Sequence, residues 1–217
     1  MSTGLTLVVY DATQLARRPR GLGLSWHVGA KLYRAFGPVD AAFGARDWLS
    51  ALTWLANYRP ETPVAEVQYW GHGKWGRALI DGDSLDRRAL DARHPLRPRL
   101  EALRARLTPD AAIWFRTCET AGARAGRDFI TALADFSGAR VAGHTFEIAF
   151  FQSGLHVLAP GATPDWSESE GLARGTPLAP ERSHPSAPHE PNTITCLTTA
   201  LANAHFQGRR SASSHSK

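Results

Sequence analysis

Cysteine is scarce in this chain of 217 residues, and the scarcity limits what the protein can be. Only Cys118 and Cys196 are present, too few for a disulfide scaffold and too far apart in sequence for a four-ligand zinc site. His184, His189 and His205 lie in or near a Pro-rich stretch without carboxylates or thiols at regular spacing. We therefore expect free thiols and no bound metal.

Long apolar runs and familiar cofactor signatures are also missing. No run of about 18 apolar residues exists, and residues 1–20 lack the pattern of a secretory leader. Neither Gly21-Leu22-Gly23 nor the glycines at 71–76 have the spacing of a phosphate-binding loop. Phe151 and Leu155 stand where a serine-hydrolase elbow around Ser153 would need glycines. We expect a soluble cytoplasmic protein without a membrane partner or a nucleotide cofactor.

The formal charge of +5 and the pI near 9.7 raise the question of nucleic acid. The arginines occur as scattered groups, near residues 17–20, 87–88 and 209–210, rather than as one patch. Such scattered groups are typical of a solvated surface, so nucleic acid is not the expected partner.

What the chain does contain is an alternation of apolar strands and amphipathic helices. A composition of 43% hydrophobic and 21% charged residues is that of a globular domain with a real core. The alternation predicts an α/β fold, with a mostly parallel sheet flanked by helices on both faces in three α/β/α layers. The expected strands are 5–10, 64–70, 111–115 and 139–142, the expected helices are 47–58, 100–107 and 126–136, and a hairpin turn is expected at 80–83.

The C-terminal third differs in composition. Seven of the fourteen prolines fall between residues 160 and 191. The predicted organisation is therefore a domain over 1–159, an irregular segment over 160–192, a helix over 193–206 packed on the same domain, and a disordered tail over 207–217.

His72 and Cys118 each follow the end of a predicted strand. The carboxyl ends of parallel strands meet at one edge of a sheet, where functional side chains gather. An imidazole next to a thiol favours the reactive thiolate and can protonate a leaving amine. The backbone amides of Gly73 and Cys118 could together bind a developing oxyanion, because glycine allows close approach. Cys196 has no comparable setting and is expected to be structural.

The motif Tyr69-Trp70-Gly71-His72-Gly73, followed 46 positions after His72 by Cys118-Glu119-Thr120-Ala121-Gly122, resembles the caspase-like (clan CD) cysteine peptidases. The stretch from Cys118 to Thr145 is similar to a bacterial caspase-like domain of large surface or repeat proteins. The resemblance covers roughly residues 64–160. It implies Cys118 as nucleophile, His72 as acid and base, and the amides of Gly73 and Cys118 as oxyanion donors.

The resemblance also bears on specificity. The Gln-Ala-Cys-x-Gly signature of animal caspases is absent, since Arg116-Thr117 precede the cysteine. In the family, the residue two before the nucleophile lines the pocket for the residue on the acyl side of the cut bond. Arg116 at that position favours an acidic side chain, whereas Asp11 could neutralise Arg116 or accept a basic residue. His144 follows a strand and is either part of the same cleft or a loop histidine bonded to backbone.

The resulting hypothesis is a cysteine endopeptidase that cuts a peptide bond through a thioester intermediate. Its partners would be a protein or peptide substrate and an activating protein, and residues 160–191 would serve as a flap over the cleft or as a site of self-cleavage. The alternative is a catalytically inactive caspase-like module that binds a peptide or a partner protein. A nucleic-acid binder is a third, weaker interpretation.

Overall fold

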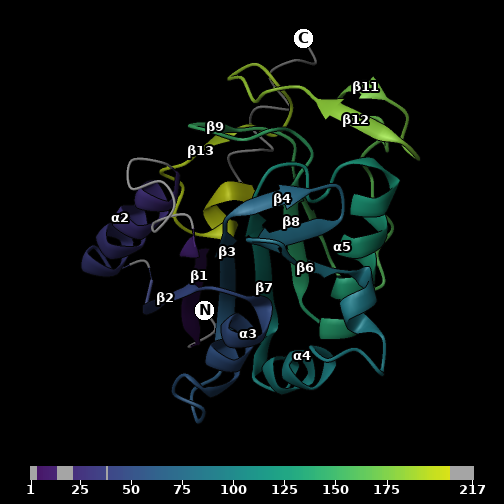
Figure 1. Ribbon diagram of the computed structural model, residues 1–217. Helices are drawn as coiled ribbons and strands as arrows, with labels where there is room; N and C mark the ends of the chain where they lie inside the picture. Colours follow the sequence, from purple (N-terminus) through teal and green to yellow (C-terminus); the bar gives the residue numbers. More distant parts are fainter. Residues whose placement is uncertain (1–3, 14–21, 38, 206–217) are drawn as a thin grey trace.

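The computed structural model describes residues 4–13, 22–37 and 39–205 (Figure 1). Its centre is a six-stranded sheet in the order β10-β8-β7-β3-β1-β2. All neighbouring strands run parallel except β10, which is antiparallel to β8. The strands are β1 (Leu5–Asp11), β2 (Ala41–Ala45), β3 (Val64–Trp70), β7 (Leu107–Arg116), β8 (Arg140–His144) and β10 (Leu155–Leu158).

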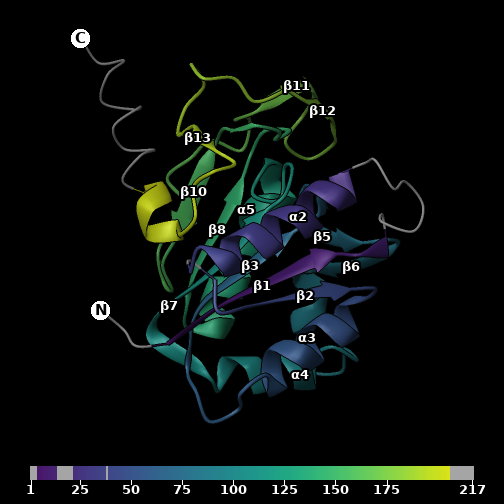
Figure 2. The same cartoon turned by 90° about the vertical axis from the view of Figure 1, so that its left-hand side faces the viewer.

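Side chains alternate between the two faces of this sheet, as the pleat requires. Leu7, Val9, Tyr69 and Phe115 join one apolar cluster with the helices α3 and α5, whereas Val8, Tyr10 and Trp70 pack with α2. Figure 2 shows α2 across the front of the sheet and α3 and α4 below it. The helices are α2 (Leu22–Ala35), α3 (Trp48–Asn57), α4 (Arg97–Arg104) and α5 (Ala123–Ser137).

This architecture confirms the α/β fold class with three α/β/α layers. The strands expected at 5–10, 64–70, 111–115 and 139–142 are β1, β3, β7 and β8. Asp47 caps α3 as its carboxylate accepts the Ser50 amide, which explains why that helix begins where expected. The helix expected at 126–136 begins three residues earlier, at Ala123.

Small sheets lie beyond the carboxyl ends of the main strands. One small sheet has three strands, contains the expected hairpin turn and follows β3 directly. The others join β11 with β12 and β13 with β9. Their strands are β4 (His72–Lys74), β5 (Arg77–Ile80), β6 (Asp83–Asp86), β9 (Phe151–Gln152), β11 (Leu172–Gly175), β12 (Pro180–Ser183) and β13 (Ile194–Thr195); a 3-10 turn, η1 (Arg87–Leu90), follows β6.

Two expectations for the C-terminal third were wrong. The segment 160–192 is not wholly irregular, because it contains the β11–β12 hairpin. The helix expected over 193–206 begins instead as β13, paired with β9, and only residues 201–205 are helical among those described. Leu201 and Ala204 are buried against Trp114 and Ala142, so this short helix covers the face of β7 and β8 that α5 leaves free. The tail at 207–217 lies outside the described residues.

Candidate active site

The register of β3 and β7 brings the two candidate catalytic residues to the same edge of the sheet. These strands are parallel neighbours, and Trp70 pairs with Arg116 at their ends. His72 and Cys118 each follow two residues later, so they leave the sheet at the same height on adjacent strands. Adjacent strands lie about 5 Å apart. Both side chains line one cavity.

Cys118 stands out because its neighbours are all buried. Every other residue from 111 to 123 is buried, and Cys118 alone is partly exposed. Backbone hydrogen bonds fix the turn: the Glu119 amide donates to the Phe146 carbonyl and the Ala121 amide to the His144 carbonyl. A rigid turn therefore presents one thiol to the cavity.

Gly73 allows the turn after β3 to lie against the turn after β7. A Cβ atom at position 73 would be 2.4 Å from Thr120 Oγ1 and 2.6 Å from the Cys118 carbonyl oxygen. No larger residue fits without displacing backbone. The Cys118 amide donates no hydrogen bond to any described residue, so it is available for the oxyanion role that the resemblance implies.

The Cys118 sulfur interacts with the backbone of Ile148. The Ile148 amide donates to Sγ at 3.4 Å, and Sγ lies 3.8 Å from the Ile148 carbonyl oxygen. Burial raises the pKa of the Cys118 thiol, and the Ile148 amide opposes this shift. The charge of Glu119 raises the same pKa further. Among the described residues, no hydrogen bond joins Sγ to the His72 ring, and the raised pKa of Cys118 favours the thiol over the thiolate.

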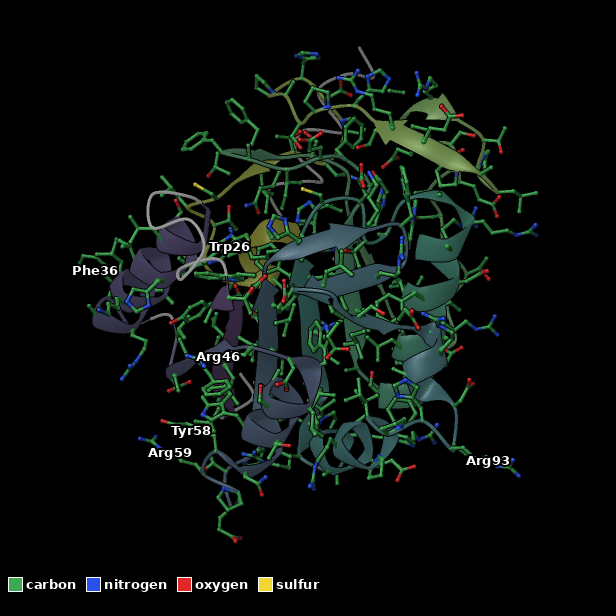
Figure 3. The ribbon with its side chains drawn as sticks, in the orientation of Figure 1. Trp26, Phe36, Arg46, Tyr58, Arg59 and Arg93 are labelled. Carbon is green, nitrogen blue, oxygen red and sulfur yellow. The ribbon has the colours of Figure 1, made fainter. Side chains whose placement is uncertain are left out.

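His72 is the first residue of β4 and is half-buried. Its ring meets the edge of Trp26 from α2, with centroids 5.3 Å apart at an interplanar angle of 81°. In Figure 3 the Trp26 side chain lies between α2 and the upper ends of β1 and β3. Helix α2 thus contributes a wall to the site, which the sequence analysis did not anticipate.

Glu119 ties three segments together behind the nucleophile. It is 3% exposed and has a left-handed backbone with φ of 56°. Its carboxylate pairs with Lys74 of β4 at 2.8 Å and accepts a hydrogen bond from Ser183 of β12. The turn bearing Cys118 is therefore joined both to the strand bearing His72 and to the β11–β12 hairpin. An acidic residue beside a candidate nucleophile was the only signal for this role in the sequence.

The cavity in front of this pair has a volume of about 450 Å³. Its lining is mostly apolar and aromatic, and comes from α2, from the turns after β3 and β7, and from the segments 148–152 and 196–197. Residues 160–191 do not contribute to the lining, so the flap expected from them is not observed. Lining residues include Trp26, Tyr33, Trp70, Ile148, Phe150 and Leu197.

Arg116 lines the cavity but is 6% exposed. Its guanidinium lies 5.3 Å from the Trp70 ring centroid and donates to the carbonyl oxygens of Cys196 and Thr198 and to Gln152 Oε1. No ion pair with a carboxylate is formed within the described part of the chain. Arg116 therefore anchors the wall at 196–198, and its positive charge beside the cavity interacts with the carboxylate of Glu66 without a direct ion pair.

Two expected members of the site lie elsewhere. Asp11 is in phase with Leu7 and Val9, so it points to the opposite face from Arg116. It is fully buried and accepts hydrogen bonds from the Thr13 amide and hydroxyl, and it neither pairs with Arg116 nor lines the cavity. The role expected for Asp11 was therefore wrong.

His144 is likewise a core residue. It ends β8, is 0% exposed, and its Nδ1 lies 3.1 Å from the Ser153 carbonyl oxygen. Burial lowers the pKa of His144 to about 3, so the ring is neutral. A substrate cannot reach it, and of the two alternatives the histidine bonded to backbone is correct.

These features define a three-layer α/β/α domain with a histidine and a cysteine beside one apolar cavity. Residues 44–148 match a family described as a domain of unknown function (DUF4347). The match spans β3, β7 and β8 and includes both His72 and Cys118. Comparisons with curated proteins and with solved structures each found no match.

Proposed function

We propose that the protein is a cysteine endopeptidase with His72 and Cys118 as its catalytic dyad. The observation that carries the proposal is the register of β3 and β7, which sets the two residues at equal heights on one cavity. The partial exposure of Cys118 within a buried turn supports it. The resemblance of the surrounding motifs to caspase-like peptidases agrees with these roles.

In the proposed reaction His72 takes the proton of Cys118, and the thiolate attacks the substrate carbonyl carbon. The amides of Gly73 and Cys118 bind the oxyanion that forms. His72 then gives its proton to the amine as the C–N bond breaks, which leaves a thioester on Cys118. A water molecule, deprotonated by His72, hydrolyses the thioester and restores the thiol.

The raised pKa of Cys118 agrees with a reaction in which the thiol loses its proton after the substrate binds. Burial disfavours a resting thiolate, so in the proposed reaction the proton leaves when a substrate holds the thiol close to the imidazole. A small alkylating agent such as iodoacetamide should therefore react slowly with Cys118 at neutral pH and faster as the pH rises.

Arg116 supports a preference for an acidic side chain on the acyl side of the cut bond. Its hydrogen-bond acceptors are neutral and it forms no direct ion pair with Glu66, the carboxylate that its charge attracts, so a carboxylate in the cavity would also be attracted to it. In a panel of peptidyl fluoromethyl ketones, compounds with Asp or Glu at this position should react fastest. A preference for apolar residues would remove this part of the proposal.

The dyad is tested by the same panel, with the second cysteine as an internal control. Cys196 lines the same cavity, so a difference in labelling between the two thiols would not be explained by one of them lying outside it. We expect peptide mapping to find the label on Cys118 alone, and His72→Ala to slow labelling by about 10²–10⁴-fold. Labelling of both cysteines, or labelling unaffected by His72→Ala, would contradict the proposal.

The second candidate is an inactive caspase-like module that binds a peptide or a partner protein in the cavity. The absence of a bond between Sγ and His72 among the described contacts, and the raised thiol pKa, favour it. Binding of unreactive peptides with equal affinity to the native chain and to Cys118→Ser, without turnover or labelling, would establish it. The need for an activating protein and self-cleavage within 160–191 stay predictions.

A further inference from the structure

Helix α2 carries a row of exposed apolar side chains on its outer surface. Leu24, Val28, Leu32 and Phe36 are 40%, 43%, 49% and 81% exposed. Leu24, Val28 and Leu32 recur every fourth residue, so they lie along one side of the helix, and Phe36 continues this spacing one residue past its end. In Figure 3 Phe36 lies at the outer left edge of the molecule, beyond the end of α2.

These residues account for half of the large apolar side chains exposed in the described part of the chain. The others are Leu49, Phe150, Leu178 and Leu197, and two of them, Phe150 and Leu197, line the cavity next to α2. A single exposed apolar residue needs no explanation, but a contiguous group indicates a surface that is covered in use. Leu32 belongs to both the row and the cavity lining, so the group is continuous.

The charged residues of α2 are of one sign. The helix contains Lys31 and Arg34 and no acidic residue. Lys31 and Arg34 are exposed on α2 itself. A second copy of the chain would bring like charges together, so the row does not favour self-association. An anionic surface would complement it.

The shape of the surface narrows the choice of partner. The row runs along a convex helix that crosses the front of the molecule in Figure 2. Leucine and phenylalanine side chains beside lysine and arginine on one helix are typical of proteins that lie on anionic bilayers. No helix of the described residues is long and apolar enough to cross a membrane, so contact through α2 would be peripheral.

We propose that α2 docks this domain on an anionic lipid surface through Leu24, Val28, Leu32 and Phe36, with Lys31 and Arg34 against the headgroups. The row would enter the boundary between headgroups and acyl chains. This proposal departs from the expectation of no membrane partner, which stays a prediction. This proposal does not depend on peptidase activity.

Co-sedimentation of the full chain with vesicles tests the proposal. We expect binding to vesicles of phosphatidylcholine mixed with phosphatidylserine, weaker binding as salt increases, and little binding to phosphatidylcholine alone. The double variant Leu24→Ser/Phe36→Ser should lower partitioning by about tenfold or more. Leu178→Ser, at a 73% exposed residue between β11 and β12, should bind like the native chain.

Charge-reversal variants distinguish binding through the basic residues of α2 from binding through the overall positive charge of the protein. Lys31→Glu/Arg34→Glu should abolish binding, whereas Arg87→Glu/Arg93→Glu, at exposed residues away from α2, should lower it only slightly. Failure of the native chain to bind anionic vesicles at low salt would overturn the proposal. So would equal losses in the two charge variants, or native binding by Leu24→Ser/Phe36→Ser. Sedimentation without lipid that finds a dimer, dissociated by Leu24→Ser/Phe36→Ser, would assign the row to self-association instead.

Discussion

The two faces of the central sheet are built from the same strands but hold different side chains. On the face covered by α3, α4 and α5, the inward positions of β1, β3 and β7 are apolar, as at Leu7, Tyr69 and Phe115, except for Asp11 at the end of β1. On the face covered by α2, the neighbouring positions include Gln68 and Arg116, both buried. The first face is closed, and the second carries the cavity.

This difference between the two faces shows where this α/β domain can bury polar side chains. Gln68 donates to the Thr199 carbonyl oxygen and accepts a hydrogen bond from the Trp70 indole, and Arg116 binds carbonyl oxygens of the same C-terminal segment. These bonds satisfy groups that would otherwise be costly to bury. A coil segment with free carbonyl oxygens can do this, whereas a packed helix cannot. The polar face thus depends on residues 194–201.

The largest effect is expected from a change on the closed face. Phe129 of α5 is 0% exposed and packs on Phe115. Phe129→Ala should lower the free energy of unfolding by about 3–5 kcal/mol. Denaturant titration would measure it, with Leu49→Ala at a half-exposed position of α3 as a control expected to cost less than about 1 kcal/mol.

If the two faces are functionally separate, folded Phe129→Ala protein should still react with the fluoromethyl ketone at Cys118. A rate close to that of the native chain would support the separation. If the labelling rate fell in proportion to the loss of stability at temperatures where the variant is folded, the two faces would not be functionally separate. Packing on the closed face would then contribute to the site.

A smaller effect, confined to the open face, is expected from Gly73→Ala. The added Cβ would overlap Thr120 Oγ1 and the Cys118 carbonyl oxygen, so the turns bearing His72 and Cys118 must separate. A displacement of about 1 Å can cost about a hundredfold in rate, and we expect a loss of that order in labelling of Cys118. Gly82→Ala is the matched control, since a Cβ there meets nothing within 4 Å. Equal rates for the two variants would show that the close contact at Gly73 is not needed.

The elements predicted correctly from the sequence are those whose local hydrophobic pattern is clear. The run at β1 is apolar on both faces, β3 and β7 contain short buried apolar runs, and α5 places Phe129, Ile130 and Leu133 on one stripe. The positions of His72 and Cys118 followed from the same logic, because both come just after such a run. Their register required only that β3 and β7 be neighbours.

The missed elements have patterns that tertiary contacts override. Helix α2 is apolar both toward the sheet, at Ala30, and outward, at Val28, and it contains Gly29, so no single stripe marks it. Strand β2 has the sequence AAFGA, with little strand propensity, and forms by pairing with β1. Strand β13 has two residues and exists only through β9.

Within the site, the face of the sheet to which each strand residue points could not be predicted from the positions of the strand ends. Asp11 and Arg116 both end strands, but they point to opposite faces, which an assignment of strand ends alone cannot detect. His144 is on the expected edge, yet β10 and the chain before it cover it. The salt bridge between Glu119 and Lys74 joins residues 45 positions apart and has no periodic signal.

The smallest predicted effect concerns Glu170, which contacts the outermost strand β10 through His156. Its carboxylate bonds His156 Nε2 at 2.6 Å and the Thr145 hydroxyl at 2.7 Å. Burial alone would raise the pKa of Glu170, but the hydrogen bond and charge of His156, together with Thr145, hold it below its usual value. Glu170→Gln should cost about 1 kcal/mol of unfolding free energy near neutral pH.

The effect of Glu170→Gln on the free energy of unfolding should depend on pH in a definite direction. Because the folded state lowers the pKa of Glu170, its ionised form stabilises the fold above the ordinary glutamate pKa of about 4.3. That contribution is lost as the pH falls through the lower folded value. The difference between the native chain and Glu170→Gln in urea unfolding should therefore shrink in acid. Glu168→Gln, whose ion pairs are 3.8 and 3.9 Å long, should show almost no difference at any pH. A constant deficit for Glu170→Gln would mean that shape, and not charge, fixes the segment after β10.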